Sequence, residues 1–467
     1  MTVPAPVEYG SVASIRGPLL VVEGVRGVGW DEVAEVRLDG GVRHGVVLDV
    51  DRDLAVVEVL EGTAALRRDE LRVAFTGSPL RIPVGEGWLG RVCNGRGEPL
   101  DGGPPVVGDV RRSVAGAAVN PAARDTPTDP IVTGVSAIDG LATLVRGQKL
   151  PLFSLGGLPH LELAAQVAAQ ARAGDEPFAV VFAAVGITRV DAMAVRDALE
   201  ERAAAGDLAL FLNTADDPLV ERIVTPRIAL TVAEHLAFDL GRHVLVVVAD
   251  LTSYAEAVRE VAAARGEIPS RRGYPGYLYS DLASLYERAG RIKGRPGSLT
   301  QIPVLTMPAG DITHPVPDLT GYITEGQLVL SQELHVSGVY PPFDALASLS
   351  RLQRLGAGPG RTREDHLEIA AQLYALASES RRIADLADVV GEAGLTPRDR
   401  RHLAFGDAFL SGFLAQRRDE KRTLAETLAR AWRVASTLPR RELTMVGQAL
   451  VDAYYVEADD EDSPAAR

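Results

Sequence analysis

The chain has a single cysteine and no long hydrophobic run among its 467 residues. One cysteine, Cys93, excludes an intrachain disulfide and suits a reducing cytoplasm, and we expect it to be a packed thiol. The longest apolar stretch, residues 178–187, is far shorter than the roughly 20 residues of a membrane-spanning helix. The first ten residues lack the basic and apolar segments of a secretion signal. We therefore expect no direct membrane insertion.

Basic residues are in the minority. The sequence contains 49 Lys and Arg against 63 Asp and Glu, which gives a net charge of −14. This balance favours solubility and argues against a nucleic-acid partner. Apolar residues make up 46% and charged residues 24%, so the composition is that of a globular protein. The length exceeds what one compact core accommodates, and two or three domains are expected.

The first 75 or so residues predict β structure. Apolar residues recur at every second position from Val46 to Val50, and β-branched runs occur at 19–22 and 55–60. Turn signals at 39–41 and 51–53 separate these runs. Short strands at this spacing are typical of a small β-barrel, which we assign to residues 1–76.

Apolar runs alternate with helical segments from about residue 131. The run VLVVVA, without alternation, predicts a strand that is covered on both faces, and the repetition predicts a parallel sheet. Gly241 is placed to end a helix as its C′ residue. We assign a central α/β domain to residues 77–360, with strands at 178–185, 208–212 and 244–249 and helices at 190–205, 228–240 and 254–265.

After about residue 360 the strand signals stop. Residues 362–365 (TRED) and 396–399 (TPRD) both predict a helix start, the first as a capping box. Phe405, Phe409 and Phe413 recur at intervals of four, which predicts one helix face packed into a core. These features define a C-terminal helical bundle over 361–467, whose acidic end is expected to be a solvated tail.

The segment 153–165 (FSLGGLPHLELAA) lies where an NTPase of this architecture would carry its phosphate-binding loop. A working loop reads G-x-x-x-x-G-K-[ST], with backbone N–H groups around the phosphates, Lys on the outer phosphates and a hydroxyl on Mg²⁺. Gly156 and Gly157 remain, but the expected Gly, Lys and Ser/Thr are replaced by Leu158, Pro159 and His160. Proline also removes an N–H donor. The sequence predicts weak or no nucleotide binding here, and a packed or hydrogen-bonded His160.

Six stretches, together with the order barrel, α/β domain and helical bundle, carry a resemblance. The chain resembles the non-catalytic B subunit of the archaeal and bacterial V/A-type rotary ATPase, from about Tyr9 to Tyr455. The family's loop commonly reads GSGLPHN, and this chain departs from it with Leu155 and Leu161, which make the loop more apolar. The stretches that carry the resemblance most specifically are 130–152, 178–188, 223–240, 268–291, 311–327 and 340–352.

The resemblance gives three further positions a meaning. In catalytic subunits the strand end with the water-activating residue reads G-E-R, whereas this chain has Ile187, which cannot polarise water. Asp250 ends a strand where Mg²⁺ is held in related NTPases, but a helix cap shared with Thr252 or Ser253 is the plainer interpretation. Arg351, in SLSRL, matches the arginine that such subunits insert into the neighbouring ATP site.

The resemblance implies a regulatory and structural subunit. It would alternate with catalytic A subunits around a central rotor stalk, contact a peripheral stator stalk, and couple ATP synthesis or hydrolysis to proton or sodium transport. It would bind no cofactor tightly, with Mg-ATP or Mg-ADP held at the interface with the A subunit, on the cytoplasmic face of the membrane. Two alternatives stay open: a self-sufficient hexameric ATPase, and a regulatory subunit that itself binds ATP tightly.

Two clusters of polar residues are interpreted without new chemistry. Arg271 and Arg272, near three tyrosines, resemble a stacking surface for nucleic acid, but a packed loop at a subunit contact is the better interpretation. Asp311, His314 and Asp318 resemble metal ligands, but the prolines between them impose an extended loop without tight ligand spacing. We predict no dedicated metal site.

Overall fold

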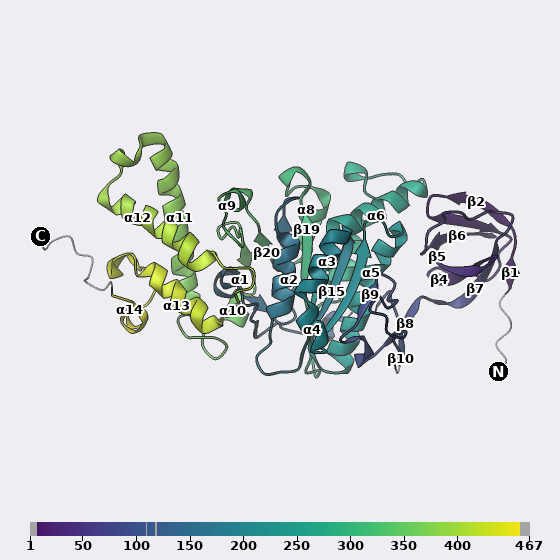
Figure 1. Ribbon diagram of the computed structural model, residues 1–467, viewed down its shortest axis with the longest axis horizontal. Helices are drawn as coiled ribbons and strands as arrows, with labels where there is room; N and C mark the ends of the chain where they lie inside the picture. Colours follow the sequence, from purple (N-terminus) through teal and green to yellow (C-terminus); the bar gives the residue numbers. More distant parts are fainter. Residues whose placement is uncertain (1–6, 109, 117–118, 458–467) are drawn as a thin grey trace, which may run out of the picture.

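The computed structural model describes residues 7–108, 110–116 and 119–457. A β domain at the N-terminal end, an α/β domain and a helical domain follow one another along the longest axis (Figure 1). This architecture confirms the fold class predicted from the sequence. The acidic tail, from residue 458 on, lies outside the described residues. None of the helices in the described part of the chain has the length and apolarity needed to cross a bilayer.

The β domain is a seven-stranded antiparallel sheet around its own apolar core. In β6, Ala55, Val57 and Val59 are fully buried in this core, and the residues between them face the other way. Val46, on β5, packs instead against the core of the α/β domain. In spatial order the strands are β1 (Glu8–Tyr9), β7 (Arg72–Pro79), β4 (Glu32–Leu38), β5 (Gly41–Asp51), β6 (Leu54–Val59), β3 (Leu19–Glu23) and β2 (Val12–Arg16).

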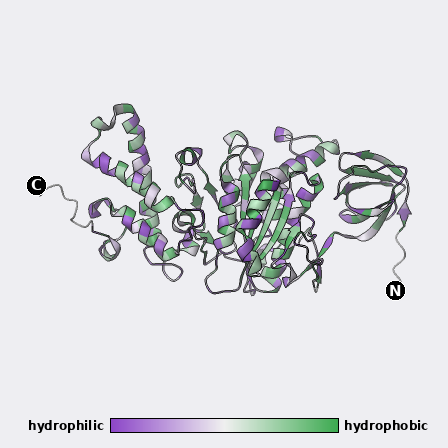
Figure 2. Cartoon of the chain, in the orientation of Figure 1, coloured by the Kyte–Doolittle hydropathy of each residue, from purple (hydrophilic) through white to green (hydrophobic). Residues whose placement is uncertain are grey.

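The central sheet is parallel except for the edge strand β21 (Leu349–Ser350) and a short antiparallel strand, β18 (Gly290–Ile292), that pairs with the beginning of β19 (Ser298–Thr306). Its strands are the most apolar part of the α/β domain (Figure 2), and β15 shows why. Val180 and Phe182 face one hydrophobic core, and Val181 and Ala183 face the other, so both faces are buried. The order is β21 (Leu349–Ser350, antiparallel), β20 (Gly326–Val329), β14 (Leu152–Ser154), β19 (Ser298–Thr306), β17 (His243–Ala249), β15 (Phe178–Ile187), β16 (Leu208–Thr214) and β9 (Val92–Asn94).

Short strand pairs surround this sheet, and helices cover its two faces. The pairs are β8 (Arg81–Val84) with β10 (Val110–Ser113), β11 (Arg124–Asp125) with β18 (Gly290–Ile292), and β12 (Pro130–Ile131) with β13 (Leu144–Val145). The helices are α1 (Ser136–Leu141), α2 (His160–Gln170), α3 (Arg189–Ala198), α4 (Glu200–Ala204), α5 (Leu219–Glu234), α6 (Leu251–Ala264), α7 (Leu278–Tyr286), α8 (Pro315–Ile323), α9 (Gln332–Val336) and α10 (Gln353–Gly356).

Two helix predictions in this domain need correction. The helix expected at 228–240 begins nine residues earlier, at Leu219, and accommodates Pro226 in its interior before a π-helical turn at His235–Asp239. The helix expected at 190–205 is interrupted at Leu199, where the backbone leaves helical geometry between α3 and α4. Gly241 has a φ of 75° after that π-helical turn, in agreement with its predicted place beyond a helix end.

The helical domain contains α11 (His366–Val390), α12 (Pro397–Ala408), α13 (Leu424–Ala435) and α14 (Gln448–Tyr454). The start signal at 396–399 is confirmed: Thr396 and Asp399 form a capping box. The capping box predicted at 362–365 is wrong. Helix α11 begins at His366, and the buried carboxylate of Asp365 accepts from the indole N–H of Trp432 instead of capping the helix.

The phenylalanines predicted to share a helix face do so. Phe405, Phe409 and Phe413 are buried, and their rings lie nearly parallel with centroids 5.9 and 5.6 Å apart. The last two lie in a π-helical turn, Phe409–Leu414, that extends α12. The same hydrophobic core contains these rings, α1 and the adjoining face of the central sheet. The helical and α/β domains therefore share one core, whereas the β domain has its own.

Candidate functional site

The carboxyl ends of four parallel strands meet at one edge of the central sheet. Ser154 at the end of β14 lies opposite Thr306 at the end of β19. Thr306 contacts Asp250, which follows β17, and β15 ends nearby in Ile187. In open parallel sheets, ligands bind outside this edge. The structure thus brings together the degenerate loop, Ile187 and Asp250, three of the four features singled out in the sequence.

Two backbone N–H groups of the loop between β14 and α2 form hydrogen bonds within the loop itself. The N–H of Leu158 donates to the carbonyl of Leu155 at 3.3 Å, and the N–H of His160 donates to the carbonyl of Leu158 at 2.8 Å. Pro159, between them, has no N–H. Gly157 adopts a φ of 89°, a conformation that favours glycine. The N–H groups that would surround a phosphate are therefore either used or missing at these positions.

His160 does not replace the missing lysine. Its Nδ1 lies 2.9 Å from the carbonyl oxygen of Leu158. Because a carbonyl only accepts, Nδ1 carries the proton and donates to it. The ring is thus held against its own turn, as expected from the sequence. A lysine supplies a long, charged arm that reaches the outer phosphates, and this imidazole does not.

Both carboxylate oxygens of Asp250 accept hydrogen bonds that hold the surrounding structure. Its Oδ1 accepts the N–H of Thr252 at 2.7 Å and caps α6, and its Oδ2 accepts the hydroxyl of Thr306 at 2.6 Å. Burial raises the pKa of the Asp250 carboxyl. The cap predicted from the sequence is present, but Asp250 supplies it alone, because the Thr252 hydroxyl donates to the Thr306 carbonyl. Both carboxylate oxygens have protein partners, which fix the orientation of the carboxylate.

Ile187 closes this edge with an apolar surface. The side chain is 8% exposed and belongs to the core beneath the sheet, and its carbonyl accepts the N–H of Ala215. A carboxylate at this position orients the attacking water in catalytic subunits, and an alkyl group cannot. At these positions the edge therefore has no lysine and no carboxylate at position 187. Its geometry agrees with the prediction of weak or no nucleotide binding, which remains a prediction.

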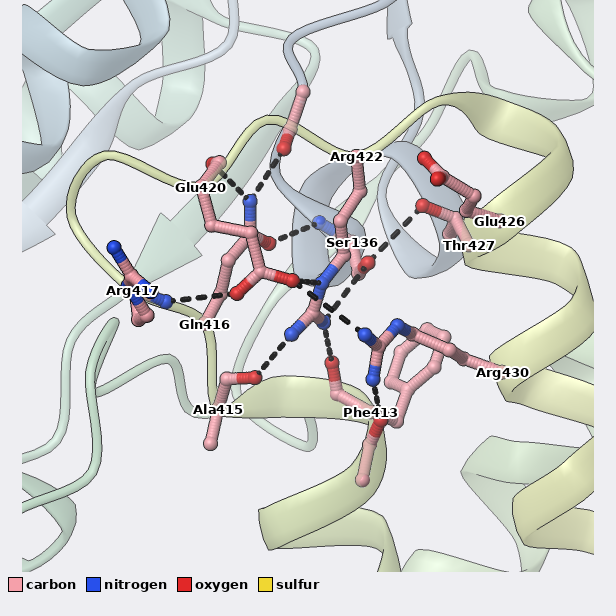
Figure 3. Close-up of polar contacts among 12 residues, drawn as sticks. Ser136, Phe413, Ala415, Gln416, Arg417, Glu420, Arg422, Glu426, Thr427 and Arg430 are labelled. Carbon is pink, nitrogen blue, oxygen red and sulfur yellow. Dashed lines mark hydrogen bonds and ion pairs between the residues drawn. The ribbon is translucent and has the colours of Figure 1, made fainter.

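A segment without any motif recognised in the sequence also contributes to this region. Residues 415–422 lie in the connection between α12 and α13, and they form hydrogen bonds with Ser136 at the beginning of α1 (Figure 3). The guanidinium of Arg422 is buried and donates to the carbonyls of Phe413 and Ala415 and to the hydroxyl of Ser136. The amide of Gln416 accepts the Ser136 N–H at 3.1 Å. No signal in the sequence marks it, because the run QRRDEKR at 416–422 is as polar as an ordinary surface connection.

The same segment contacts α2, the helix that follows the degenerate loop. Gln166 donates to backbone carbonyls of the segment and accepts the hydroxyl of Tyr340 at 2.8 Å. Arg418 forms an ion pair with Glu162 at 3.0 Å, and its guanidinium lies 5.3 Å from the centre of the Tyr340 ring. Arg418 and Tyr340 border a cavity of about 580 Å³, which is lined by Gly338, Tyr340 and residues 415–420.

Arg351 lies near the amino ends of the parallel strands, on the side of the sheet opposite their carboxyl ends. It follows Ser350 of β21, which pairs with Gly326 at the amino end of β20. Because β20 is parallel to β14, the loop after β14 lies beyond the other end of these strands. The guanidinium is exposed and makes one long contact, 3.4 Å, to the carbonyl of Thr324. Within the described residues no carboxylate lies in salt-bridge range of it. Arg351 thus faces away from the degenerate loop of its own chain.

The other charged candidates are internally paired. Arg271 forms an ion pair with Asp318 at 2.8 Å, and Arg272 forms one with Asp311 at 2.6 Å. Of the three tyrosines, Tyr274 is buried, whereas Tyr277 and Tyr279 are 40% and 51% exposed. The ion pairs join two loops of the α/β domain, and the subunit contact stays a prediction. The arginines and the carboxylates are thus engaged with one another.

Comparisons with known proteins cover all three domains. Residues 12–77 match the ATP synthase alpha/beta family, beta-barrel domain, and residues 134–350 match its nucleotide-binding domain. Residues 355–455 match the C-terminal domain of V and A type ATP synthase. A curated relative, the B subunit of the A-type ATP synthase of Aeropyrum pernix, is 55% identical over 451 residues, which are 96% of this chain and 97% of the relative.

A solved structure agrees with this assignment. It is described as a unique ATP synthase subunit, NeqB, from Nanoarcheaum equitans. The two chains are 38% identical, and the TM-score is 0.71 over 90% of this chain and 100% of the other. With a relative at 55% identity over nearly the full length and matches to all three domain models, the chain belongs to the B-subunit family of the A-type and V-type ATP synthases.

Proposed function

We propose that this chain is a non-catalytic B subunit that alternates with catalytic A subunits in the headpiece of a rotary ATP synthase. It contributes one half of each catalytic interface and inserts Arg351 into the ATP site of the neighbouring A subunit. Its own site at the degenerate loop does not hydrolyse ATP. The relatives named above, which are subunits of ATP synthases, support membership of such a complex.

The observation that carries the proposal is the placement of Arg351. The guanidinium is exposed, has no carboxylate partner among the described residues, and lies at the sheet edge away from its own loop. An exposed arginine held by backbone contacts alone is available to a partner. A planar and permanently charged guanidinium binds phosphoryl oxygens bidentately, and charge develops on these oxygens during phosphoryl transfer. An arginine supplied by a neighbouring subunit would also make turnover depend on closure of the interface.

The test is turnover of a reconstituted complex with Arg351→Ala. An arginine that stabilises the transition state is worth about 10³-fold or more in kcat, so most ATP hydrolysis should be lost while the ring still assembles. Arg354→Ala is the matched control, because Arg354 is also exposed and lies three residues further along. Turnover of the Arg351→Ala complex equal to that of the Arg354→Ala complex would refute the role.

Two measurements on the isolated chain separate the alternatives. A self-sufficient ATPase would hydrolyse ATP without the A subunit, and we expect no such turnover, because the lysine and the water-activating carboxylate are absent. A nucleotide-binding regulatory subunit would bind Mg-ATP tightly. Calorimetry should detect no sub-micromolar binding, since the lysine is absent and the N–H groups of Leu158 and His160 are already engaged.

The remaining parts of the proposal concern the place of the chain in the complex. The β domain would join the crown that holds the ring together, and the helical domain would face the central rotor stalk. A peripheral stator stalk would hold the headpiece at the cytoplasmic face of the membrane. ATP synthesis or hydrolysis in this headpiece would be coupled to transport of protons or sodium ions. Cross-linking of the assembled complex from residues of each domain would test this arrangement.

A further inference from the structure

Two consecutive buried residues, Gln148 and Lys149, approach Arg351 from inside the protein. Gln148 is fully buried and Lys149 is 5% exposed. They lie just before β14, at the end of that strand opposite the degenerate loop. Both contact Glu325, the residue before β20, and Glu325 in turn holds the backbone of Arg351. Burying an amide and an ammonium group costs free energy unless both are hydrogen-bonded or paired, so their partners indicate what they hold in place.

The amide of Gln148 joins the two strands from which Arg351 projects. Its Nε2 donates to the carbonyl of Glu325 at 3.0 Å and to the hydroxyl of Ser350 at 2.9 Å. Its Oε1 accepts the N–H of Val145 at 2.9 Å. The Ser350 hydroxyl donates its own proton to the carbonyl of Thr143 at 3.0 Å. Both N–H donors and the carbonyl oxygen of this amide group are engaged, so its orientation is fixed.

Lys149 holds the same glutamate through its side chain and its backbone. Its Nζ lies 3.0 Å from a carboxylate oxygen of Glu325 and 3.0 Å from one of Glu287. Its N–H donates to the other Glu325 carboxylate oxygen at 2.8 Å, and its carbonyl accepts the Glu325 N–H at 3.0 Å. Glu325 is therefore held at its backbone and at both carboxylate oxygens.

The last link connects Glu325 to Arg351. The Glu325 carbonyl accepts the Arg351 N–H at 3.0 Å in addition to the Gln148 amide, and the Thr324 carbonyl accepts from the guanidinium. We propose that Gln148 and Lys149 are positioning residues that hold Arg351 in the orientation from which it enters the neighbouring ATP site. This inference rests on the proposed function of Arg351. It adds two buried residues that touch neither nucleotide nor partner.

The physical reason is that a contact to the transition state tolerates very little displacement of the contacting group. A guanidinium improves phosphoryl transfer only when it lies at the developing charge, and a misplacement of about 1 Å costs about 10²-fold in rate. Among the described residues, Arg351 has no side-chain partner that would set its position, so its backbone must do so. Loosening Glu325 would let the β20–β21 end shift without opening the core of the sheet.

The experiment is a double-mutant cycle in the reconstituted complex. Gln148→Leu keeps the side-chain volume and removes the amide, and we expect kcat to fall about 10- to 100-fold with KM changed less than about twofold. In an Arg351→Ala background the same change should have no further effect on kcat, because Gln148 acts only through Arg351. Ring assembly is measured in parallel by size-exclusion chromatography.

The outcomes distinguish the two proposals. Normal kcat with Gln148→Leu, or an equal additional loss in the Arg351→Ala background, would overturn the positioning role. Normal turnover of Arg351→Ala itself would overturn the proposed function. If Gln148→Leu prevents assembly, Lys149→Met and Lys149→Arg decide the question in the same cycle. Lys149→Met should lower kcat, whereas Lys149→Arg should keep kcat near the wild-type value, since only arginine keeps the charge beside Glu325 and Glu287. Equal kcat for these two variants would refute the role of Lys149.

Discussion

Replacing Glu58 by glutamine should stabilise this protein at alkaline pH. Glu58 lies on the outer face of β6 and borders a cavity of about 260 Å³ between the β domain and the α/β domain. It is 5% exposed, and its Oε1 has no hydrogen-bond partner among the described residues. Burial raises the pKa of Glu58 from its ordinary 4.5 to about 7, and the charges of Arg265 and Arg227 oppose this only in part.

The magnitude follows from the linkage between protonation and folding. Between pH 4.5 and about 7 the unfolded chain has lost the Glu58 proton and the folded chain has kept it. Stability therefore falls as the pH rises through this window. One pKa unit corresponds to about 1.4 kcal/mol, so the loss reaches about 3 kcal/mol above pH 7. Glutamine has the same shape and no charge, so a Glu58→Gln variant avoids this loss.

The assay is urea unfolding of the full chain at pH 5 and pH 8.5, followed by far-ultraviolet circular dichroism. At pH 5 the wild type and Glu58→Gln should have similar free energies of unfolding. At pH 8.5 the variant should be more stable by about 3 kcal/mol. Glu23→Gln is the matched control, because Glu23 is an exposed glutamate on the neighbouring strand β3. Equal effects of the two substitutions at pH 8.5 would refute the reasoning.

Three further predictions follow from buried groups. Burial raises the pKa of the Cys93 thiol from 9.0 to about 11, so at pH 8 its thiolate fraction is about 100-fold smaller, and thiol titration should label it only after unfolding. Phe409→Ala leaves a cavity between two stacked rings and should cost about 3–5 kcal/mol in chemical denaturation. Glu234→Ala should cost a similar 3–5 kcal/mol, because it leaves the buried guanidinium of Arg288 without its bidentate partner. A loss below about 1 kcal/mol in either variant would contradict these assignments.

Local signals in the sequence predicted the fold because the decisive features are themselves local. The buried run at the end of β17, the capping box at Thr396 and the glycine at 241 each depend on neighbours within a few residues. The missing lysine at the loop was visible for the same reason, since a phosphate loop is a contiguous motif. Arg351 required the family resemblance, because nothing in its immediate sequence distinguishes it from other exposed arginines.

Features that depend on distant partners were missed. In the capping box predicted at 362–365, both carboxylate oxygens of Asp365 are engaged by the neighbouring Arg363, and one of them also accepts from Trp432, a residue 67 positions away. Segment 415–422 gave no structural prediction, since its partners Ser136 and Gln166 lie in another domain. The helix expected at 228–240 begins at Leu219 and accommodates Pro226 in its buried interior.

The core shared by the helical and α/β domains has a consequence for how the chain comes apart. Apolar side chains of α1, α11 and α13 form one continuous cluster with the sheet, so separating the two domains would expose a large apolar surface to water. A fragment that ends near residue 360 should therefore aggregate rather than fold as a smaller unit. The β domain, with its separate core, should instead unfold as an independent step. A force applied to the helical domain would thus be transmitted directly to the central sheet, because the two are packed as one rigid unit.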